Sequence, residues 1–342
     1  MKVSIITTIY KAEKDLPRLL DSMMALKSPE LEFFLIDNGS PDRCGEICAE
    51  YAVRDKRFVI RTLKDNIGYV RARNLGLQEV NSDYVGFCDS DDFLEPDGYD
   101  DAIEKLKQTN CDFYITAYNE ISGSTKRRIL PPFRVAEYKG TEKEEIILPQ
   151  LFGFLPGRSQ LTGFVWKHIY KHSIIKNNGI LFRENLLPYE DEIFNIDVAN
   201  QSKTIVVDDC PIYNYVNNPQ SITKKMINSF NLSKEWERIE QVYSERKIRI
   251  SEGVRTAFYN AMLDYFYTMV LWAIKTNKKS VFKLASQFRR TINQDIVNDV
   301  DKNCGHDIRK EYRFLIFCLQ RRWYIILITA IQFMLFKKNK SH

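Results

Sequence analysis

Short apolar runs alternate with helical patterns along the first part of the chain. Residues 3–9 and 32–37 consist mostly of β-branched, aromatic and other apolar residues, which is typical of buried strands. Between them, over residues 12–26, leucines and a methionine recur at helical spacing and indicate a helix with one buried face. This order predicts a right-handed βαβ unit, whose two strands run parallel in one sheet.

The same alternation continues to about residue 118. The further elements that it predicts are helices over 42–54 and 69–79 and strands over 57–62, 83–88 and 112–118. We therefore predict an α/β fold, in which helices cover both faces of the sheet. Ligands of such sheets bind at the carboxyl ends of the strands, so the loops that follow the strands are the candidate site.

The pattern then becomes mixed and finally helical. The predicted elements are strands near 203–207 and 212–216, followed by helices over 231–248, 253–275 and 279–293. We predict a domain over 1–225 and a helical C-terminal region over 226–342. Its segment AFYNAMLDYFYTMVLWAI is apolar around most of a helix, which favours a buried bundle helix over a ligand or lipid site.

Charge separates the same two regions. Residues 237–342 contain 20 Lys or Arg and 10 Asp or Glu, and because the whole chain carries +5, the preceding residues carry −5. The basic region is expected to face something anionic, either a membrane surface or a phosphorylated ligand. Its charges accompany long apolar stretches rather than polar loops with aromatic residues, which argues against nucleic-acid binding.

The segment RRWYIILITAIQFMLFKKNKSH, at 321–342, combines an apolar run with basic pairs. The run from Trp323 to Phe336 would be about 21 Å long as a helix, so it is not expected to span the roughly 30 Å core of a bilayer. Two interpretations remain. The tail over about 312–342 either lies in an anionic membrane surface or forms a buried helix that packs in the protein or in a homo-oligomer.

Cysteine usage and the first residues bear on location. Seven cysteines are scattered without a C-x-x-C pair, which argues against a disulfide framework and favours a reducing compartment. The segment MKVSIITTIY enters a strand pattern without a basic leader or a cleavage site. We therefore expect a cytoplasmic protein.

Three carboxylates crowd the end of the predicted strand over 83–88. Asp89, Asp91 and Asp92 lie in the segment CDSDD, where their mutual repulsion requires a cation or hydrogen-bond donors in compensation. Three interpretations fit the cluster alone: a divalent-metal site with hard oxygen ligands, a helix N-terminal cap, or a solvated acidic turn.

Two other loops add polar groups at the same edge. Asp37 begins the turn DNGSPD, which suits either a contact to a base or ribose, or an ordinary turn capped by Ser40 or Asp42. The segment NIGYVRARNLG places Arg71 and Arg73 at a helix start, where guanidinium and amide groups suit phosphate oxygens. These arginines equally suit neutralisation of the neighbouring acidic loops.

Five segments in this order resemble the inverting nucleotide-sugar transferases of glycosyltransferase family 2, which have the GT-A fold. They are VSIITTIYKAEKDLPRLLDS, IDNGSPD, NIGYVRARNLG, FCDSDDFL and PYEDEIF, within residues 1–220. The resemblance implies a Rossmann-like mixed sheet flanked by helices, with a donor half at about 1–118 and an acceptor half at about 119–225. It also implies a bacterial enzyme of capsule, O-antigen or cell-wall polysaccharide synthesis.

The resemblance assigns a role to individual donor-side residues. The residues that it implies for UDP-sugar binding are Thr8, Tyr10, Glu13, Asp37, Asn66, Arg73, Asp89 and Asp92. Asp89 and Asp91 would form the D-x-D pair, with Asp91 the more direct ligand of Mn²⁺ or Mg²⁺ and Asp92 facing the sugar or the acceptor. The ion would bridge the diphosphate and stabilise charge on the departing UDP.

The segment YEDEIF matches the family's E-D-x-x-F pattern, which implies Asp191 as the catalytic base and Glu190 as a supporting or acceptor-binding residue. Inversion requires a base on the face of the sugar opposite the leaving group, where it takes the proton of the attacking hydroxyl. Glu192 adjoins this pair. Neighbouring residues on a helix point about 100° apart, so only one acid is expected to aim at the reaction centre.

The segment GFVWKHIYKHSII resembles the family's acceptor side. Trp166 is expected either to stack on a sugar or to fill the core, and Lys167 or His168 to contact an acceptor phosphate. His168 and His172 have the spacing of a metal-binding helix face, but no third ligand accompanies them, so we reject zinc. Further along, in YNYVNNPQSIT, the resemblance implies that Ser221 and Thr223 close over the donor.

Together these features predict a metal-dependent inverting hexosyl- or N-acetylhexosaminyl-transferase, peripheral on the inner face of a bacterial cell membrane. The predicted donor is a UDP-sugar and the predicted acceptor a lipid-linked glycan. Transfer to polyprenyl phosphate and a non-catalytic nucleotide-sugar-binding scaffold are the alternatives. The acids of YEDEIF argue against the scaffold, while the Asp37–Asn38 turn departs from the family's commoner Asp-Asp and leaves one donor contact open.

Overall fold

A mixed sheet organises the first part of the chain. The computed structural model describes residues 1–152, 163–187, 189–217, 230–276, 280–306 and 308–340. In this part of the chain, ten strands form one sheet in the order β3-β2-β1-β4-β9-β6-β10-β5, with β7 paired to β6 and β8 to β10. Their bounds are Val3–Ile9 (β1), Leu31–Asp37 (β2), Phe58–Thr62 (β3), Tyr84–Asp89 (β4), Phe93–Leu94 (β5), Phe113–Ser122 (β6), Thr125–Ile129 (β7), Ala136–Lys139 (β8), His168–Lys171 (β9) and Thr204–Val216 (β10).

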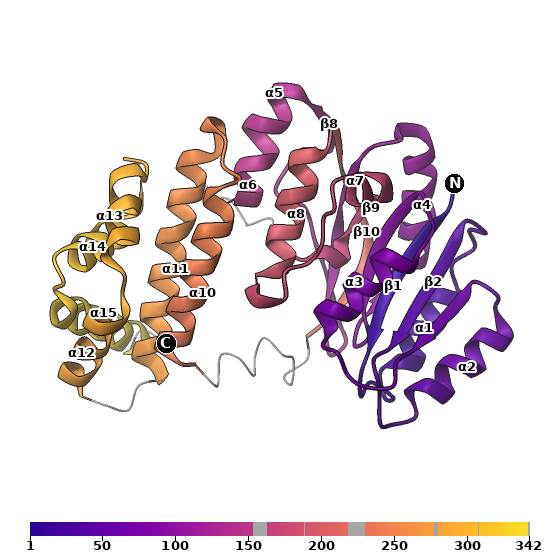
Figure 1. Cartoon of the computed structure of the whole chain (residues 1–342), viewed down its shortest axis with the longest axis horizontal. Coiled ribbons are helices and arrows are strands. Elements are labelled where there is room, and N and C mark those ends of the chain that lie inside the picture. Colours follow the sequence, from indigo (N-terminus) through magenta and orange to yellow (C-terminus); the bar gives the residue numbers. More distant parts are fainter. Residues whose placement is uncertain (153–162, 188, 218–229, 277–279, 307, 341–342) are drawn as a thin grey trace. The chain divides into compact units, whose positions relative to one another are not determined.

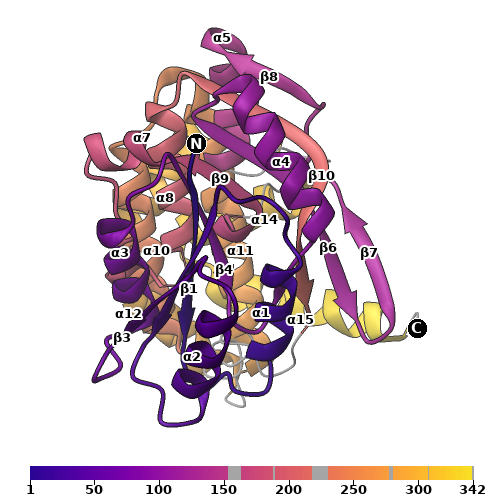
Figure 2. The same cartoon turned by 90° about the vertical axis from the view of Figure 1, so that its right-hand side faces the viewer.

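The strands β1 to β4 run parallel to one another, as the sequence predicts, and β6 and β10 form a second parallel pair. β1 pairs with β2 and β4, and β2 pairs with β3, so their carboxyl ends meet at one edge. β9 is inserted between β4 and β6 and runs antiparallel to both. Figure 2 shows β1 beside β4 and the hairpin of β6 and β7. The predicted fold class, a mixed sheet flanked by helices, is confirmed.

Helices cover both faces of this sheet. α1 (Leu16–Met24), α2 (Cys44–Arg54) and α4 (Pro96–Thr109) bury their apolar sides in one core, together with Val3, Ile5 and Ile9 of β1. On the other face, α3 (Tyr69–Glu79) approaches β1 closely because Gly76 has no side chain. A Cβ there would lie 2.6 Å from the Ile6 side chain. α7 (His172–Asn177) and α8 (Glu190–Gln201) follow later in the chain.

β10 corrects one prediction. The strands expected at 203–207 and 212–216 are one strand, whose pairing with β6 shifts register on either side of Pro211. Proline has no backbone N–H to donate to the ladder, so the apparent break is an irregularity within the strand rather than a loop. The other elements predicted within 1–118 agree with the structure to within four residues at each end.

The C-terminal part is helical, as predicted. Its helices are α10 (Leu232–Lys247), α11 (Arg255–Thr276), α12 (Val281–Thr291), α13 (Gln294–Asn303), α14 (Lys310–Gln320) and α15 (Tyr324–Lys340). α10 and α11 lie side by side (Figure 1), and Trp236 stacks on Phe266 between them. α11 is buried along most of its length, which confirms the interpretation as a bundle helix.

The chain divides into two compact units. One consists of residues 1–143 and 161–218, and the other of residues 144–160 and 219–342. The short helix α6 (Leu148–Phe152) belongs to the second unit, where Arg246 of α10 donates a hydrogen bond to the Phe152 carbonyl at 2.8 Å. The predicted domain boundary near residue 225 lies outside the described residues and stays a prediction.

The apolar tail run forms α15. One side of this helix, with Tyr324, Leu327, Ile328 and Ile331, is buried against α12 and α14. The tail therefore packs in the protein along this side, as the second interpretation of the tail requires. Among the described helices, none combines the length and the apolar character needed to cross a membrane.

Candidate active site

The candidate loops meet at the carboxyl edge of the parallel strands. Ile9 pairs with Asp37 and Thr8 pairs with Asp89, so β1, β2 and β4 end at the same level of the sheet. The segment CDSDD leaves this edge from β4, and α3 begins beside it after the loop that follows β3. The sequence segments of the predicted donor site are thus brought together by strand register alone.

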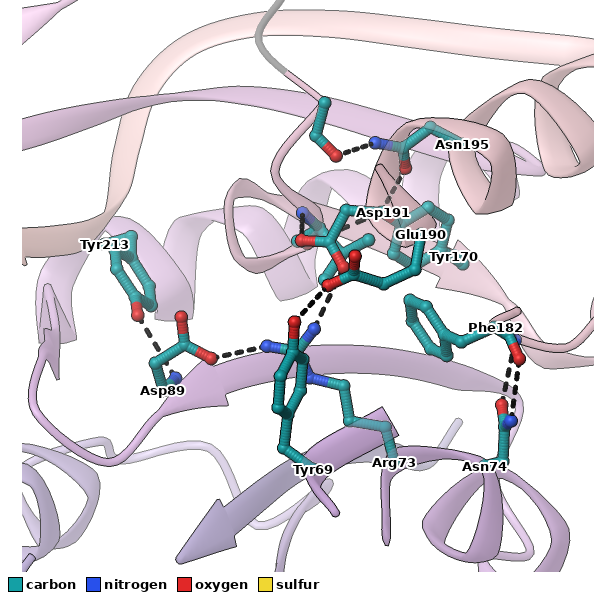
Figure 3. A network of polar contacts seen from close by, with 12 residues as sticks. Tyr69, Arg73, Asn74, Asp89, Tyr170, Phe182, Glu190, Asp191, Asn195 and Tyr213 are labelled. Carbon is teal, nitrogen blue, oxygen red and sulfur yellow. Dashed lines mark hydrogen bonds and ion pairs between the residues drawn. The ribbon is translucent and has the colours of Figure 1, made fainter. Parts of the chain in front are cut away.

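Arg73 of α3 joins two of the predicted carboxylates (Figure 3). Its Nη2 lies 2.6 Å from Oδ1 of Asp89, and its Nη1 lies 2.9 Å from Oδ1 of Asp191. The three residues come from α3, β4 and α8, and 118 positions separate Arg73 from Asp191. The D-x-D segment and the E-D segment therefore share one guanidinium group.

The surroundings of Arg73 fix its orientation. The guanidinium carbon lies 5.2 Å from the ring centroid of Tyr69 and 5.7 Å from that of Phe182, and the residue is only 6% exposed. Asn74 anchors the Phe182 segment through two backbone hydrogen bonds, of 2.9 Å to the carbonyl and 2.8 Å from the N–H. Because a buried cation needs compensating charge, the two carboxylates stabilise Arg73 in this position.

The first turn of α8 presents both of its leading acids to α3. The Tyr69 hydroxyl donates to Oε1 of Glu190 at 2.6 Å, while Asp191 contacts Arg73, one helical turn beyond Tyr69. Glu190 and Asp191 therefore both contact α3, Glu190 through Tyr69 and Asp191 through Arg73. Oε2 of Glu190 is buried without a hydrogen-bond partner, and burial raises the pKa of this carboxyl.

Asp191 is mostly buried and lies among several charged groups. Burial, together with the nearby charges of Glu190 and Asp89, raises the pKa of Asp191 to about 7, while Arg73 acts in the opposite direction. The backbone N–H of Val165 donates to its Oδ2 at 3.4 Å. The carboxylate is therefore held between α3 and the segment that precedes β9, with a pKa that suits proton transfer at neutral pH.

Asn195, one turn further along α8, fixes that preceding segment. Its Nδ2 donates to the Gly163 carbonyl at 2.7 Å, and its Oδ1 accepts from the Tyr170 hydroxyl at 2.6 Å. Gly163 is required here because a Cβ would lie 2.0 Å from Cγ of Glu192. The backbone that contacts Asp191 is thus positioned by α8 itself.

Asp92 does not lie where the sequence predicts. It is 2% exposed; its Oδ2 accepts from the Tyr213 hydroxyl at 2.7 Å and its Oδ1 from the Val216 N–H at 2.6 Å. Burial raises its pKa to about 8. Because β5 pairs with β10, Asp92 turns toward β10 and anchors the loop there, instead of facing a sugar or an acceptor.

Asp89 and Asp91 remain partly exposed at the end of β4. Tyr213 supports this position, since its hydroxyl also accepts the Asp89 N–H at 3.2 Å, and Arg18 donates to the Asp91 carbonyl at 2.6 Å. No cluster of three or more potential metal ligands occurs within the described residues. Two carboxylates fit a divalent ion whose remaining ligands come from elsewhere, such as a diphosphate and water.

The nucleoside-side residues lie around the turn after β2. Asp37 is buried and accepts the Ser40 N–H at 3.0 Å, and Gly39 has a positive φ of 67° and packs directly on the backbone of Asp65. Asn66 accepts from the side chain of Asn38 at 3.4 Å. Of the other predicted residues, Thr8 is partly buried, and Tyr10 and Glu13 are exposed at the end of β1. Their contacts to a donor stay predictions.

The three predicted acceptor residues lie in the interior. Trp166 packs with the rings of Phe164, Tyr118, Tyr213 and Tyr215, as the core interpretation requires. Lys167 is buried, which lowers its pKa to about 7, and His168 is fully buried beside Phe113. They are buried because β9 and the turn before it run through the middle of the sheet. This placement leaves none of the three open to an acceptor from solvent.

Three further expectations concern residues elsewhere in the chain. His168 lies in β9 and His172 begins α7, so their spacing does not produce one helix face, in agreement with the rejection of zinc. Arg71, unlike Arg73, is exposed and pairs with Glu184 at 2.5 Å. Ser221 and Thr223, predicted to close over the donor, lie outside the described residues.

Several residues of the site were not predicted from sequence. Tyr69, Phe182 and Tyr213 each contact a predicted carboxylate or Arg73, and Tyr170 and Asn195 belong to the hydrogen bonds that hold the segment before β9. Tyr69 lies at helical spacing from Arg73, which was a usable signal. The other contacts join segments far apart in sequence, and single-chain patterns contain no signal for them.

Comparison with known proteins agrees with this geometry. Residues 4–164 match the model of the family described as glycosyl transferase family 2. The chain is 30% identical over 223 residues to the uncharacterized glycosyltransferase EpsJ of Bacillus subtilis. This alignment covers 65% of this chain and 63% of EpsJ. It is 25% identical over 216 residues to the poly(ribitol-phosphate) beta-N-acetylglucosaminyltransferase TarS of Staphylococcus aureus, covering 62% of this chain and 35% of TarS. The matches thus span less than two thirds of each relative's length.

Solved structures show the same fold. The structure of S. aureus TarS in complex with UDP-GlcNAc has a TM-score of 0.72 at 18% identity, covering 97% of this chain and 92% of that chain. The mannosyltransferase PcManGT from Pyrobaculum calidifontis, in complex with GDP-Man and Mn²⁺, has a TM-score of 0.54 at 12% identity, covering 96% and 86%. Residues 4–164 are therefore similar to glycosyltransferase family 2, and the chain has the GT-A fold of these structures, followed by a helical region.

Proposed function

We propose that this chain is an inverting glycosyltransferase, which moves a hexosyl or N-acetylhexosaminyl group from a UDP-sugar to a hydroxyl group of a lipid-linked oligosaccharide. The observation that carries the proposal is the Arg73 bridge, since it holds the leaving-group motif, at Asp89, within reach of the proposed base, Asp191. The UDP-GlcNAc bound by TarS supports a uridine donor.

Asp191 supplies the proton transfer in this proposal. The acceptor hydroxyl gives its proton to the Asp191 carboxylate as its oxygen bonds to the anomeric carbon. The bond from that carbon to the diphosphate breaks, and its electron pair leaves with UDP. A carboxyl with a pKa of about 7 is a much stronger base than an exposed aspartate and is still substantially deprotonated at neutral pH.

A divalent ion, Mn²⁺ or Mg²⁺, fits the remaining part of the site. Asp91 and Asp89 would hold it, because they are the partly exposed carboxylates of the cluster, whereas Asp92 is buried against β10. Such an ion neutralises charge on a diphosphate leaving group. Arg73 stabilises Asp89 in this position, and Tyr213 orients the loop that carries both acids.

The acceptor is proposed from the family and from the apolar, basic C-terminal helices. A lipid-linked glycan in capsule, O-antigen or cell-wall synthesis would place the chain at the inner face of a bacterial cell membrane. Transfer to polyprenyl phosphate is the second candidate, favoured by the same helices. Thin-layer chromatography of products from a lipid phosphate and from a lipid-linked oligosaccharide separates the two.

Activity is expected to rise with pH through about 7 and then to level off. The reason is that only the deprotonated form of Asp191 accepts a proton, and its pKa lies near 7 in the absence of donor. Initial rates at low donor concentration, measured across this range, report kcat/KM and hence the free enzyme. A profile that is flat across neutral pH, or that falls as pH rises, contradicts the assignment of Asp191.

Asp91→Asn is expected to raise the metal concentration needed for half-maximal activity by at least roughly tenfold, because it removes one of two charged ligands. Titration with Mn²⁺ or Mg²⁺ after chelation measures this. Asp97→Asn, at an exposed position of α4, is the matched control and should titrate like the wild type. Equal titration curves for both variants contradict the role of Asp91.

A panel of nucleotide sugars tests the proposed reaction class. Release of UDP from at least one uridine donor, dependent on a divalent ion, is the expected result. A folded protein that releases no nucleotide from any uridine donor overturns the proposal and favours another nucleotide or the non-catalytic scaffold.

A further inference from the structure

The outer side of α14 combines aromatic and basic residues. Lys310, Arg313, Phe314 and Phe317 are exposed at helical spacing, Arg321 continues the stripe at the C-cap, and Glu311 and Gln320 are exposed beside it. Its other side, including Tyr312, Leu315 and Leu319, is buried. The aromatic and basic residues are therefore exposed on a helix whose other side is packed in the protein.

Exposed apolar residues continue from α14 to α15, which pack against each other. At the turn between them, Trp323 is 46% exposed and meets the edge of the Phe317 ring at 5.4 Å between centroids. Along α15 the exposed side chains include Ile326 and Phe333, which is 58% exposed. We use the term α14–α15 surface for the exposed residues Lys310, Arg313, Phe314, Phe317, Arg321, Trp323, Ile325, Ile326, Phe333, Phe336 and Lys337.

Positive charge accompanies this apolar surface. Residues 309–340 contain eight Lys or Arg and a single acid, Glu311. Two of the cations lie directly over exposed rings: Arg321 at 3.9 Å from the Phe317 centroid and Lys337 at 4.6 Å from the Phe333 centroid. Rings with cations beside them are typical of surfaces that bury apolar groups at a bilayer interface and keep the charges among the headgroups.

We propose that the α14–α15 surface binds an anionic lipid bilayer, with both helices lying along the membrane plane. Charge complementarity selects this occupant. The same surface of a second copy would present the same positive charge, so a symmetric contact is opposed, whereas phosphate headgroups supply the opposite charge. Neither helix is long and apolar enough to cross a membrane, so contact is limited to the interface. The proposal differs from a freely inserted tail because α14 takes part and one side of α15 stays packed in the protein.

The contribution of positive charge to bilayer binding is tested by flotation of the full chain with vesicles of phosphatidylglycerol and phosphatidylcholine, without donor or acceptor. The triple variant Lys310→Gln, Arg321→Gln, Lys337→Gln is expected to bind roughly 100-fold more weakly, at about fivefold for each charge near the surface. The matched control Lys56→Gln, Lys105→Gln, Lys176→Gln has the same net charge but alters exposed lysines of the other unit. It should bind like the wild type.

The contribution of the exposed aromatic rings to bilayer binding is tested with Phe317→Ser and Phe333→Ser, singly and together. The double variant is expected to bind at least roughly tenfold more weakly, because two rings no longer enter the interface. Val53→Ser, at an exposed apolar position of α2, is the control and should bind like the wild type.

In the wild type, vesicles should shift tryptophan emission to shorter wavelength, and Trp323→Phe should remove most of that shift.

These experiments do not depend on the proposed reaction, since none of the substituted residues lies in the candidate active site and UDP release is measured separately. Equal vesicle binding by the α14–α15 variants and their controls overturns the proposal. So does binding to neutral vesicles as strong as to anionic ones. A change in sedimentation of the protein alone, with no vesicle binding, overturns it in favour of a contact between two copies.

Discussion

Asp191→Asn is expected to lower sugar transfer by about 10³-fold while leaving UDP-sugar binding close to that of the wild type. Asparagine keeps the shape of the side chain and still accepts the Val165 N–H, but it cannot take a proton. Steady-state rates give the loss, and calorimetric titration with UDP gives binding. The loss should not be recovered at higher pH, because no titrating group remains at this position.

Glu192→Gln is the matched control for Asp191→Asn. Glu192 is the next acid of the same segment, and its side chain packs beside Gly163. Glutamine preserves that packing, so activity should stay within a few fold of the wild type. Transfer by Asp191→Asn near the wild-type rate, with a folded protein, would show that the proton goes to another group.

Arg73→Gln is the second substitution with a large expected effect, roughly 100-fold or more on kcat/KM at neutral pH. Removing the guanidinium leaves Asp89, Asp191 and Glu190 close together without the cation that compensates them. The pKa of Asp191 should therefore rise further above its usual range, and the rising part of the pH profile should move to higher pH. The profile distinguishes this effect from a simple loss of donor affinity.

Two other variants keep the Arg73 experiment interpretable. Arg73→Lys retains the charge but not the fork that reaches both carboxylates, so it should recover only part of the activity. Arg71→Gln removes the exposed neighbour that pairs with Glu184 and should behave like the wild type. If Arg71→Gln and Arg73→Gln are equally active, or if the pH profile of Arg73→Gln is unchanged, the bridge has no role in catalysis.

The fold of the donor side could be predicted from sequence because its information is local. Buried parallel strands appear as continuous apolar runs, and the helices between them show one apolar face. The prediction failed at β10, where Pro211 interrupts the pattern without ending the strand. It also did not predict β9, which enters the sheet antiparallel between β4 and β6.

The candidate site was predictable in its carboxylates but not in their contacts. Strand register explains why Asp37 and Asp89 lie at the same edge of the sheet, on the strands either side of β1, and the alternation of strands was visible in the sequence. The bridge from Arg73 to Asp191 depends on how α8 is placed after a mixed region, which no local pattern specifies. For the same reason Asp92 was assigned to a sugar, although its partner is Tyr213, 121 residues away.

The central claim, that Asp191 acts on the side of the sugar opposite the D-x-D segment, is tested most directly by the stereochemistry of the product. Transfer from a UDP-α-sugar should give a β-linked product, which proton NMR identifies from the coupling of the anomeric proton. An α-linked product, formed by an active enzyme from the same donor, would contradict inversion and with it the role of Asp191.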